Sequence, residues 1–137
     1  MDTTMTLPVK EMPARKADSA ILKRNILIIE DDVDTAETLA EFLKDEGYGC
    51  RYVCSRDDAV LALQRFLYDV VIMDYSMPGL SADSFVALAR GRCPRSKFIL
   101  TTAMGKVTEC ADSLGIHSWI GKPFRPEALL EVIRKCH

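Results

Sequence analysis

The sequence predicts a single α/β domain in which a doubly wound, five-stranded parallel β-sheet is covered by helices on both faces. Apolar residues fill consecutive positions in the runs ILII, VVIM and FIL, as in strands that are buried on both faces of a parallel sheet. Segments with the apolar spacing of amphipathic helices separate these runs. The length of 137 residues, 48% of them hydrophobic, suits one core of ordinary size.

Five β-α units are expected to follow one another along the chain. Apolar runs between turn signals indicate the strands, and apolar residues three or four positions apart indicate the helices. The predicted strand and helix of each unit are Ile26–Glu30 with Asp34–Glu46, Gly49–Cys54 with Asp57–Leu67, Asp69–Asp74 with Ala82–Gly91, Lys97–Thr102 with Lys106–Leu114, and Ile116–Gly121 with Pro126–Cys136.

Three of the predicted helices carry a clear apolar stripe that would pack against the sheet. Pro126 suits the first position of the last helix, while Gly47 and Gly91 are expected to end their helices. The stripes consist of Ala36, Leu39, Ala40 and Leu43 in the first helix, Ala59, Leu63, Phe66 and Leu67 in the second, and Leu129, Leu130 and Ile133 in the last.

The composition argues against several classes of function. A net charge of −2 leaves no excess of Lys or Arg to follow a phosphate backbone, so we expect no direct binding of nucleic acid. No apolar run reaches the ~20 residues of a membrane helix, and no apolar signal segment is present, so we expect no membrane association and a cytoplasmic location. Residues 1–20 lack a period and are interpreted as an N-terminal tail, and residues 21–137 as the domain.

Polar and charged residues stand where four of the predicted strands end. In sheets of this kind, ligands bind outside the carboxyl ends of the strands. Four carboxylates in one crevice repel one another by on the order of 3 kcal/mol per pair at ~5 Å and an effective dielectric near 20. Either some acids take up protons, or a hard cation such as Mg²⁺ lies among them. The residues are Glu30, Asp31 and Asp32 after the first strand, Asp74 after the third, Thr102 after the fourth and Lys122 just past the fifth.

Each of these residues also has an ordinary structural explanation. Asp32 could cap the helix that begins near Asp34, and Asp74 could form a turn. Lys122 could be a solvated surface lysine, and Thr102 a β-branched strand residue. These explanations do not predict that the residues end neighbouring strands. A carboxylate beside a divalent cation, an ammonium and a hydroxyl suits phosphoryl transfer, with Asp74 attacking phosphorus.

Four stretches of the sequence together resemble the pattern of a known family. They are ILIIEDD, VVIMDYSMPG, LTTAM and WIGKPF, with a β-α unit between each. On these residues, the chain from Asn25 to Cys136 resembles the receiver domain of two-component response regulators. The resemblance implies a flavodoxin-like receiver fold with parallel strands in the order 2-1-3-4-5. It also implies that the bond between Lys122 and Pro123 is cis.

The resemblance implies a role for each acidic residue of the site. Asp74 matches the phosphoacceptor and a metal ligand. Asp31 matches a direct Mg²⁺ ligand, and Glu30 a residue that usually acts through water. The main-chain carbonyl of Ser76 matches a further metal ligand. The cofactor implied is Mg²⁺.

Function then follows from the same resemblance. A histidine kinase or histidine phosphotransfer protein would supply phosphohistidine, and hydrolysis of the aspartyl phosphate would reset the domain. Lys122 matches the lysine that contacts the phosphoryl group, while Thr102 and Trp119 match the switch hydroxyl and the switch aromatic residue. Thr102 and Trp119 would move toward the site, and the phosphate would bias a surface formed by the fourth helix, fifth strand and fifth helix. The protein would be a phosphorelay signalling module and not an enzyme on other substrates.

Two departures and several alternatives stay open at this stage. The segment from Thr102 to Gly115 is shorter than usual in the family, so the fourth helix should be short or irregular. Trp119 is bulkier than the usual switch residue. Alternatives are a receiver-like binding module that needs no phosphate, or an Mg²⁺-dependent phosphohydrolase, although Ser76 stands where haloacid-dehalogenase-like enzymes want a second Asp. We expect a stand-alone receiver or one whose output domain is missing, with homodimerisation through the tail as a further alternative.

Overall fold

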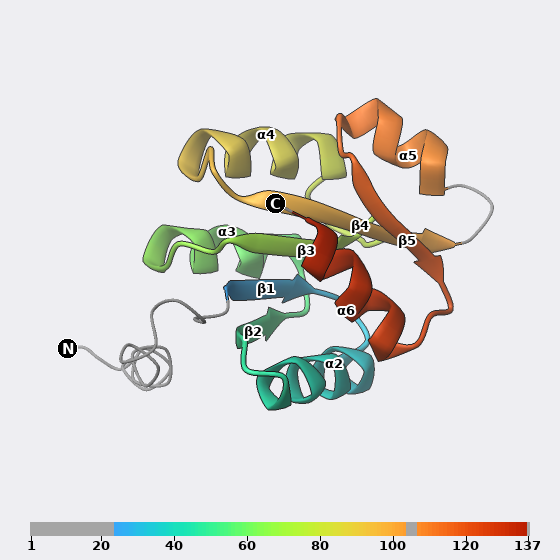
Figure 1. The fold of residues 1–137 in the computed structure, drawn as a ribbon. Helices are drawn as coiled ribbons and strands as arrows, with labels where there is room; N and C mark the ends of the chain where they lie inside the picture. The colour runs from blue at the N-terminus through green and yellow to red at the C-terminus, as the bar shows by residue number, and fades with distance from the viewer. Residues whose placement is uncertain (1–23, 104–106, 137) are drawn as a thin grey trace.

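The computed structural model describes residues 24–103 and 107–136 (Figure 1). The predicted tail, residues 1–20, lies outside this range. One parallel sheet has the strand order β2-β1-β3-β4-β5, which confirms the predicted fold class and topology. The strands are β1 (Asn25–Ile29), β2 (Gly49–Val53), β3 (Val70–Asp74), β4 (Lys97–Ala103) and β5 (Ser118–Lys122).

The helices form two layers, one on each face of the sheet (Figure 1). They are α2 (Val33–Asp45), α3 (Arg56–Arg65), α4 (Ala82–Arg92), α5 (Val107–Leu114) and α6 (Pro126–Lys135). Helices α2 and α6 cover one face, and α3, α4 and α5 cover the other. Helix α5 has 8 residues, as the short segment before Gly115 predicts, and its predicted first residue, Lys106, lies outside the described residues.

The sheet has a hydrophobic core on each face, and alternate residues of the same strands point into one core or the other. Because successive side chains of a strand point to opposite faces, a strand that feeds both cores must be apolar at every position. This requirement explains the continuous runs ILII, VVIM and FIL. The core beneath α3, α4 and α5 includes Leu27, Val71 and Leu100, and the core beneath α2 and α6 includes Ile28, Ile72 and Ile99.

The strand register brings the functional ends of the strands to the same level. Ile29 of β1 pairs with Met73 of β3, so Glu30 and Asp74 are each the next residue on neighbouring strands. Lys122 is the last residue of β5 and pairs with Ala103 of β4. The sheet therefore presents acids from its centre and an ammonium from its edge at one end.

The prediction that Gly91 ends its helix is wrong. Helix α4 continues through Gly91 to Arg92, and Cys93 is its C-cap, with a main-chain N–H that donates to the carbonyl of Ala89 at 2.7 Å. Pro94 follows, and a residue before proline is driven out of the helical conformation. Proline therefore ends α4. Gly47, in contrast, follows α2 with a φ of 100°, as expected for a glycine that ends a helix.

The predicted apolar stripe of the second helix is wrong at Leu67. Helix α3 ends at Arg65, and its C-cap, Phe66, has an extended backbone, so Leu67 lies beyond the helix and is 68% exposed. Ala59 and Leu63 are buried as predicted. Leu67 continues the apolar spacing of the sequence, but because the helix has already ended, this spacing does not place Leu67 on its buried face.

The packing of α3 yields a test of the fold. We expect Leu63→Ala to lower the free energy of unfolding by about 2–5 kcal/mol, because the side chain is fully buried and its loss leaves a cavity. Leu61→Ala is the matched control on the same helix, since Leu61 is 56% exposed. Urea denaturation measures both. Equal losses in the two variants would contradict the assignment of the buried face.

Candidate functional site

Three carboxylates converge at the carboxyl ends of β1 and β3. Glu30 and Asp74 are 4% and 5% exposed, whereas the neighbouring Asp31 is exposed. One ligand oxygen from each of the three residues lies within 4.8 Å of the others. The two apolar strands fix this arrangement, because each carries its acid directly after a residue that is locked in the core. The structure thus brings together three of the four acids that the sequence predicted at this edge, and Asp32 is not one of the three.

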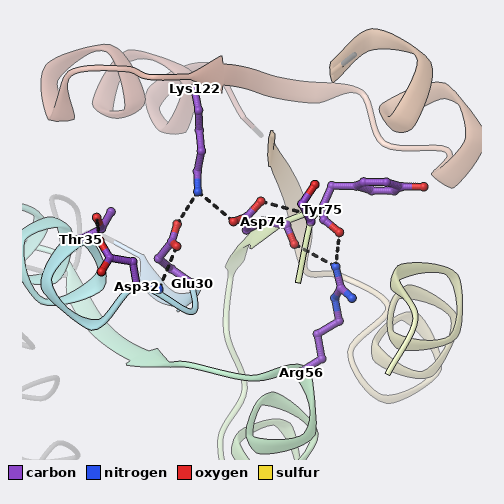
Figure 2. Close-up of polar contacts among 8 residues, drawn as sticks. Glu30, Asp32, Thr35, Arg56, Asp74, Tyr75 and Lys122 are labelled. Carbon is purple, nitrogen blue, oxygen red and sulfur yellow. Dashed lines mark hydrogen bonds and ion pairs between the residues drawn. The ribbon is translucent and has the colours of Figure 1, made fainter. Parts of the chain in front are cut away.

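Lys122 from β5 forms an ion pair with two of these acids (Figure 2). Its Nζ donates to Glu30 Oε1 and to Asp74 Oδ2, each at 2.8 Å. The bond that follows, from Lys122 to Pro123, is cis, as the resemblance implied. Lys122 therefore spans the gap between the two buried carboxylates.

Main-chain N–H groups occupy the other oxygens of the two buried acids. The N–H of Asp32 donates to Glu30 Oε2 at 3.1 Å, and the N–H of Ser76 donates to Asp74 Oδ1 at 3.1 Å. Each acid is therefore held by one main-chain donor and by the Lys122 ammonium. A carboxylate bound at both oxygens keeps one orientation, which a site for a cation or a phosphoryl group requires.

The pKa values of this ion pair move away from their ordinary values. Burial raises the pKa of Glu30 above 4.5, and the hydrogen bonds from Lys122 and from the N–H of Asp32 oppose this rise only in part. Burial alone would lower the pKa of Lys122, but its hydrogen bonds to Asp74 and Glu30 outweigh burial and raise the pKa above 10.5. Lys122 is therefore fully charged at neutral pH.

Asp32 does not make the capping bond that the sequence suggested, whereas Thr102 lies near the end of the fourth strand as predicted. Asp32 is the N-cap residue of α2, yet its carboxylate makes no capping bond to the main chain and instead accepts from the Thr35 hydroxyl. Thr102 lies in β4 and is 3% exposed, and its hydroxyl makes no hydrogen bond to any residue that the structure describes. Trp119 in β5 is 38% exposed, so its ring lies at the surface.

The sequence did not point to Arg56, which is the only buried arginine in the described part of the chain. As the first residue of α3, it would ordinarily be taken for a solvated surface residue. It is instead 2% exposed and donates to main-chain carbonyls of the loop after Asp74 (Figure 2). No local pattern marks such a residue, because its partners lie 18 to 24 positions away.

The donor set fits a small hard cation. All of its side-chain donors are carboxylate oxygens, which Mg²⁺ and Ca²⁺ prefer over the nitrogen and sulfur ligands that zinc often takes. Among the described residues, only one ammonium, that of Lys122, forms ion pairs with this cluster, and it contacts two of the three acids. The cluster therefore carries surplus negative charge that a divalent cation would offset.

Comparison with known families agrees with this geometry. The family description "response regulator receiver domain" matches residues 26–134, which is most of the chain. The chain belongs to this family. Receiver domains are signalling modules of two-component response regulators, and histidine kinases or phosphotransfer proteins phosphorylate them. The five-stranded sheet is thus the fold of a receiver domain.

Relatives support the same assignment, and solved structures share the fold. The receiver domain is 31% identical over 112 residues to the response regulator protein FleR of Pseudomonas aeruginosa, covering 80% of this chain and 24% of FleR. The Vibrio cholerae chemotaxis protein CheY4 shares the fold with a TM-score of 0.76 and 23% identity, covering 84% of this chain and 99% of that one. A response regulator from Burkholderia pseudomallei, solved with a phosphorylated aspartic acid and a calcium ion, has a TM-score of 0.70 and 23% identity, covering 81% of this chain and 66% of that one.

Two further facts bear on the whole protein. The curated relatives are longer than this receiver domain, which spans between 24% and 50% of their length. Within residues 24–103 and 107–136, none of the helices has the length and apolar character needed to span a bilayer. The cytoplasmic location stays a prediction from the sequence.

The Lys122 ion pair predicts how stability depends on pH in the cation-free receiver domain. At neutral pH, Lys122→Met should lower the free energy of unfolding by about 1–2 kcal/mol, since the ammonium is partly exposed. The folded-state pKa of Lys122 is raised, so its contribution is present below pH 10.5 and is lost as the pH rises through the folded pKa. The difference between wild type and variant should therefore shrink above pH 10.5.

Urea denaturation in the presence of a chelator measures this difference across the pH range. Lys97→Met is the control, because Lys97 is exposed and lies at the other end of β4. A wild-type advantage over Lys122→Met that persisted unchanged well above pH 10.5 would contradict the role of the ammonium.

Proposed function

We propose that this receiver domain accepts a phosphoryl group on Asp74. The observation that carries the proposal is the joint geometry of Glu30, Asp31, Asp74 and Lys122, because a nucleophilic carboxylate beside an acidic cation site and an ammonium suits phosphoryl transfer. The phosphorylated aspartic acid in the Burkholderia structure shows that this fold can carry one. The proposal extends that chemistry to this chain.

The transfer from phosphohistidine balances with few participants. A carboxylate oxygen of Asp74 forms a bond to phosphorus, the bond from phosphorus to the histidine nitrogen breaks, and the electron pair returns to the imidazole, which then takes a proton. Lys122 already donates to Asp74, and it would donate to an oxygen of the incoming group. Glu30 and the N–H of Ser76 hold Lys122 and the carboxylate in position. The domain would thereby catalyse its own phosphorylation and later hydrolysis.

Mg²⁺ is the proposed cofactor. Asp31, Asp74 and the main-chain carbonyl of Ser76 would hold it directly, and Glu30 would hold it through water. When bound, it supplies positive charge next to the phosphoryl oxygens. The support for this assignment is the cluster of carboxylate oxygens within 4.8 Å and its surplus negative charge.

The proposed partner is a histidine kinase or a histidine phosphotransfer protein, and the proposed output is a change of protein contacts. Thr102 and Trp119 would respond to the phosphoryl group and alter the surface formed by α5, β5 and α6. Their positions support this part of the proposal. Thr102 precedes Ala103, the last residue of β4, which pairs with Lys122, and Trp119 lies exposed on β5. Homodimerisation is a second proposed response.

The two alternatives predict different chemistry. A receiver-like binding module would gain no phosphoryl group, and a phosphohydrolase would turn over unrelated phosphoesters. The family assignment and the ion pair of Lys122 with Asp74 favour the phosphoacceptor over both.

Incubation with acetyl phosphate and Mg²⁺ tests the proposal. We expect a labile mass gain of one phosphoryl group in wild type, measured by mass spectrometry of the intact protein. Asp74→Asn should lose it, because an amide is a far poorer nucleophile, and Asp31→Asn should require far more Mg²⁺. Asp83→Asn is the control, since Asp83 is an exposed residue in the first turn of α4. Absence of any adduct on intact wild type would overturn the proposal.

The single tryptophan offers a direct test of the proposed switch. A beryllofluoride adduct with Mg²⁺ imitates the aspartyl phosphate, and an inward movement of the Trp119 ring would shift its fluorescence emission to shorter wavelength. The expected shift starts from a ring that is 38% exposed. Asp74→Asn should show no shift. An unchanged spectrum in a wild-type sample whose adduct is demonstrated by fluorine NMR would rule out Trp119 as the switch.

A further inference from the structure

The guanidinium of Arg56 forms hydrogen bonds with the loop that begins at the proposed phosphoacceptor, Asp74. Its side chain is 2% exposed and is among the largest fully buried side chains of the described residues. Nη2 donates to the carbonyls of Asp74 at 3.0 Å and Tyr75 at 2.5 Å, and Nη1 donates to those of Met77 at 3.3 Å and Leu80 at 2.7 Å. Four main-chain carbonyls from one seven-residue stretch thus converge on a single guanidinium.

These contacts surround Ser76 without using its carbonyl. The carbonyls of Tyr75 and Met77, on either side of Ser76, both accept from Arg56. The N–H of Met77 also donates to the Tyr75 carbonyl at 3.2 Å, which closes a tight turn with Ser76 at its centre. The N–H of Ser76 donates to Asp74 Oδ1. The peptide groups on both sides of Ser76 are therefore fixed, and its carbonyl is left available for another partner.

We propose that Arg56 is a positioning residue for the acidic site. It holds the loop from Asp74 to Leu80 so that the Ser76 carbonyl and the Asp74 carboxylate keep the places needed for cation binding and phosphoryl acceptance. This inference rests on the proposed function of the same site. Helix α3 contributes no group to the chemistry itself, but through Arg56 it would hold the loop between β3 and α4 in its conformation.

The chemistry of the contacts requires arginine at this position. A guanidinium is planar and carries its donors on separate nitrogens in a fixed fork, so two nitrogens can serve four carbonyls at once. A lysine has one nitrogen on a flexible stem and cannot span the same set. Arg56 Nε, moreover, is buried and has no hydrogen-bond partner in the structure, so the two Nη groups alone set the position of the guanidinium.

The two cations hold opposite sides of Asp74 (Figure 2). Lys122 reaches the carboxylate from β5, whereas Arg56 reaches the main chain of the same residue from α3. Lys122 therefore contacts the reacting group, and Arg56 acts only through the loop. For this reason the effect of Arg56 should appear in cation affinity and in the rate of phosphorylation together.

Arg56→Lys tests the inference, and Arg92→Lys is the matched control. Arg92 also donates to two main-chain carbonyls, those of Leu63 at 2.9 Å and Gln64 at 3.0 Å, but it joins α4 to the end of α3 away from the acids. Three quantities are measured for each variant: the Mg²⁺ dissociation constant by calorimetry, the rate of phosphorylation by acetyl phosphate at saturating Mg²⁺, and the melting temperature. Arg56→Gln, which keeps two donors without a charge, is the second variant and replaces Arg56→Lys if that protein does not fold.

We expect the Arg56 variants to weaken Mg²⁺ binding by about 10-fold or more and to slow phosphorylation, as for other groups that orient metal ligands. Arg92→Lys should stay within about twofold of wild type in both, even where its melting temperature falls equally. Amide hydrogen exchange in cation-free protein should show faster exchange at Ser76 and Met77 in the Arg56 variants only.

The outcomes separate this inference from the proposed function. A wild type that binds Mg²⁺ and takes up phosphate, together with Arg56 variants that match Arg92→Lys, overturns the role of Arg56 alone. A wild type that does neither overturns the proposed function and this inference with it. Loss in the Arg56 variants that merely follows the melting temperature, as in Arg92→Lys, also overturns the positioning role.

Discussion

The constraint on which this structure depends is the confinement of three carboxylates within 4.8 Å of one another. At ~5 Å and an effective dielectric near 20, each pair of charges repels by on the order of 3 kcal/mol. Glu30 and Asp74 cannot relax into water, because each directly follows a strand residue that is locked in the core. The apolar sheet thus supplies the stability that keeps like charges together, and each polar contact around them can be understood as compensation.

Groups from three parts of the chain offset the repulsion among the carboxylates. Lys122 brings an ammonium from the edge strand β5, and the N–H groups of Asp32 and Ser76 each bind one buried carboxylate. These contacts leave the pKa of Glu30 raised by burial, so the compensation is incomplete. An incomplete balance is useful in a binding site, since a fully neutralised cluster would have little affinity for a cation. The remaining negative charge would be the driving force for the proposed binding of Mg²⁺.

The sequence predicted the fold and the clustering of Glu30, Asp31 and Asp74 well, because both follow from local signals. Continuous apolar runs reveal parallel strands, and charged residues at the ends of such runs reveal what the sheet presents at its edge. The predicted ends of two helices were wrong. Helix α4 continues past Gly91 to Arg92, just before Pro94, and α3 ends at Arg65, so Leu67 lies outside it. Arg56 could not be predicted, because its carbonyl partners are brought to it only by the folded loop.

The contrast between the two cations completes the physical account of the site. Lys122 has a side chain that is 32% exposed on a flexible stem, so it can exchange one oxygen partner for another when a phosphoryl group arrives. Arg56 is almost fully buried and bound to four carbonyls, so it cannot follow such a change without breaking several buried hydrogen bonds. A site that must bind, react and then reset needs both kinds of group. In the proposed mechanism, the movable charge of Lys122 takes part in the chemistry, and the fixed charge of Arg56 preserves the geometry to which the site returns.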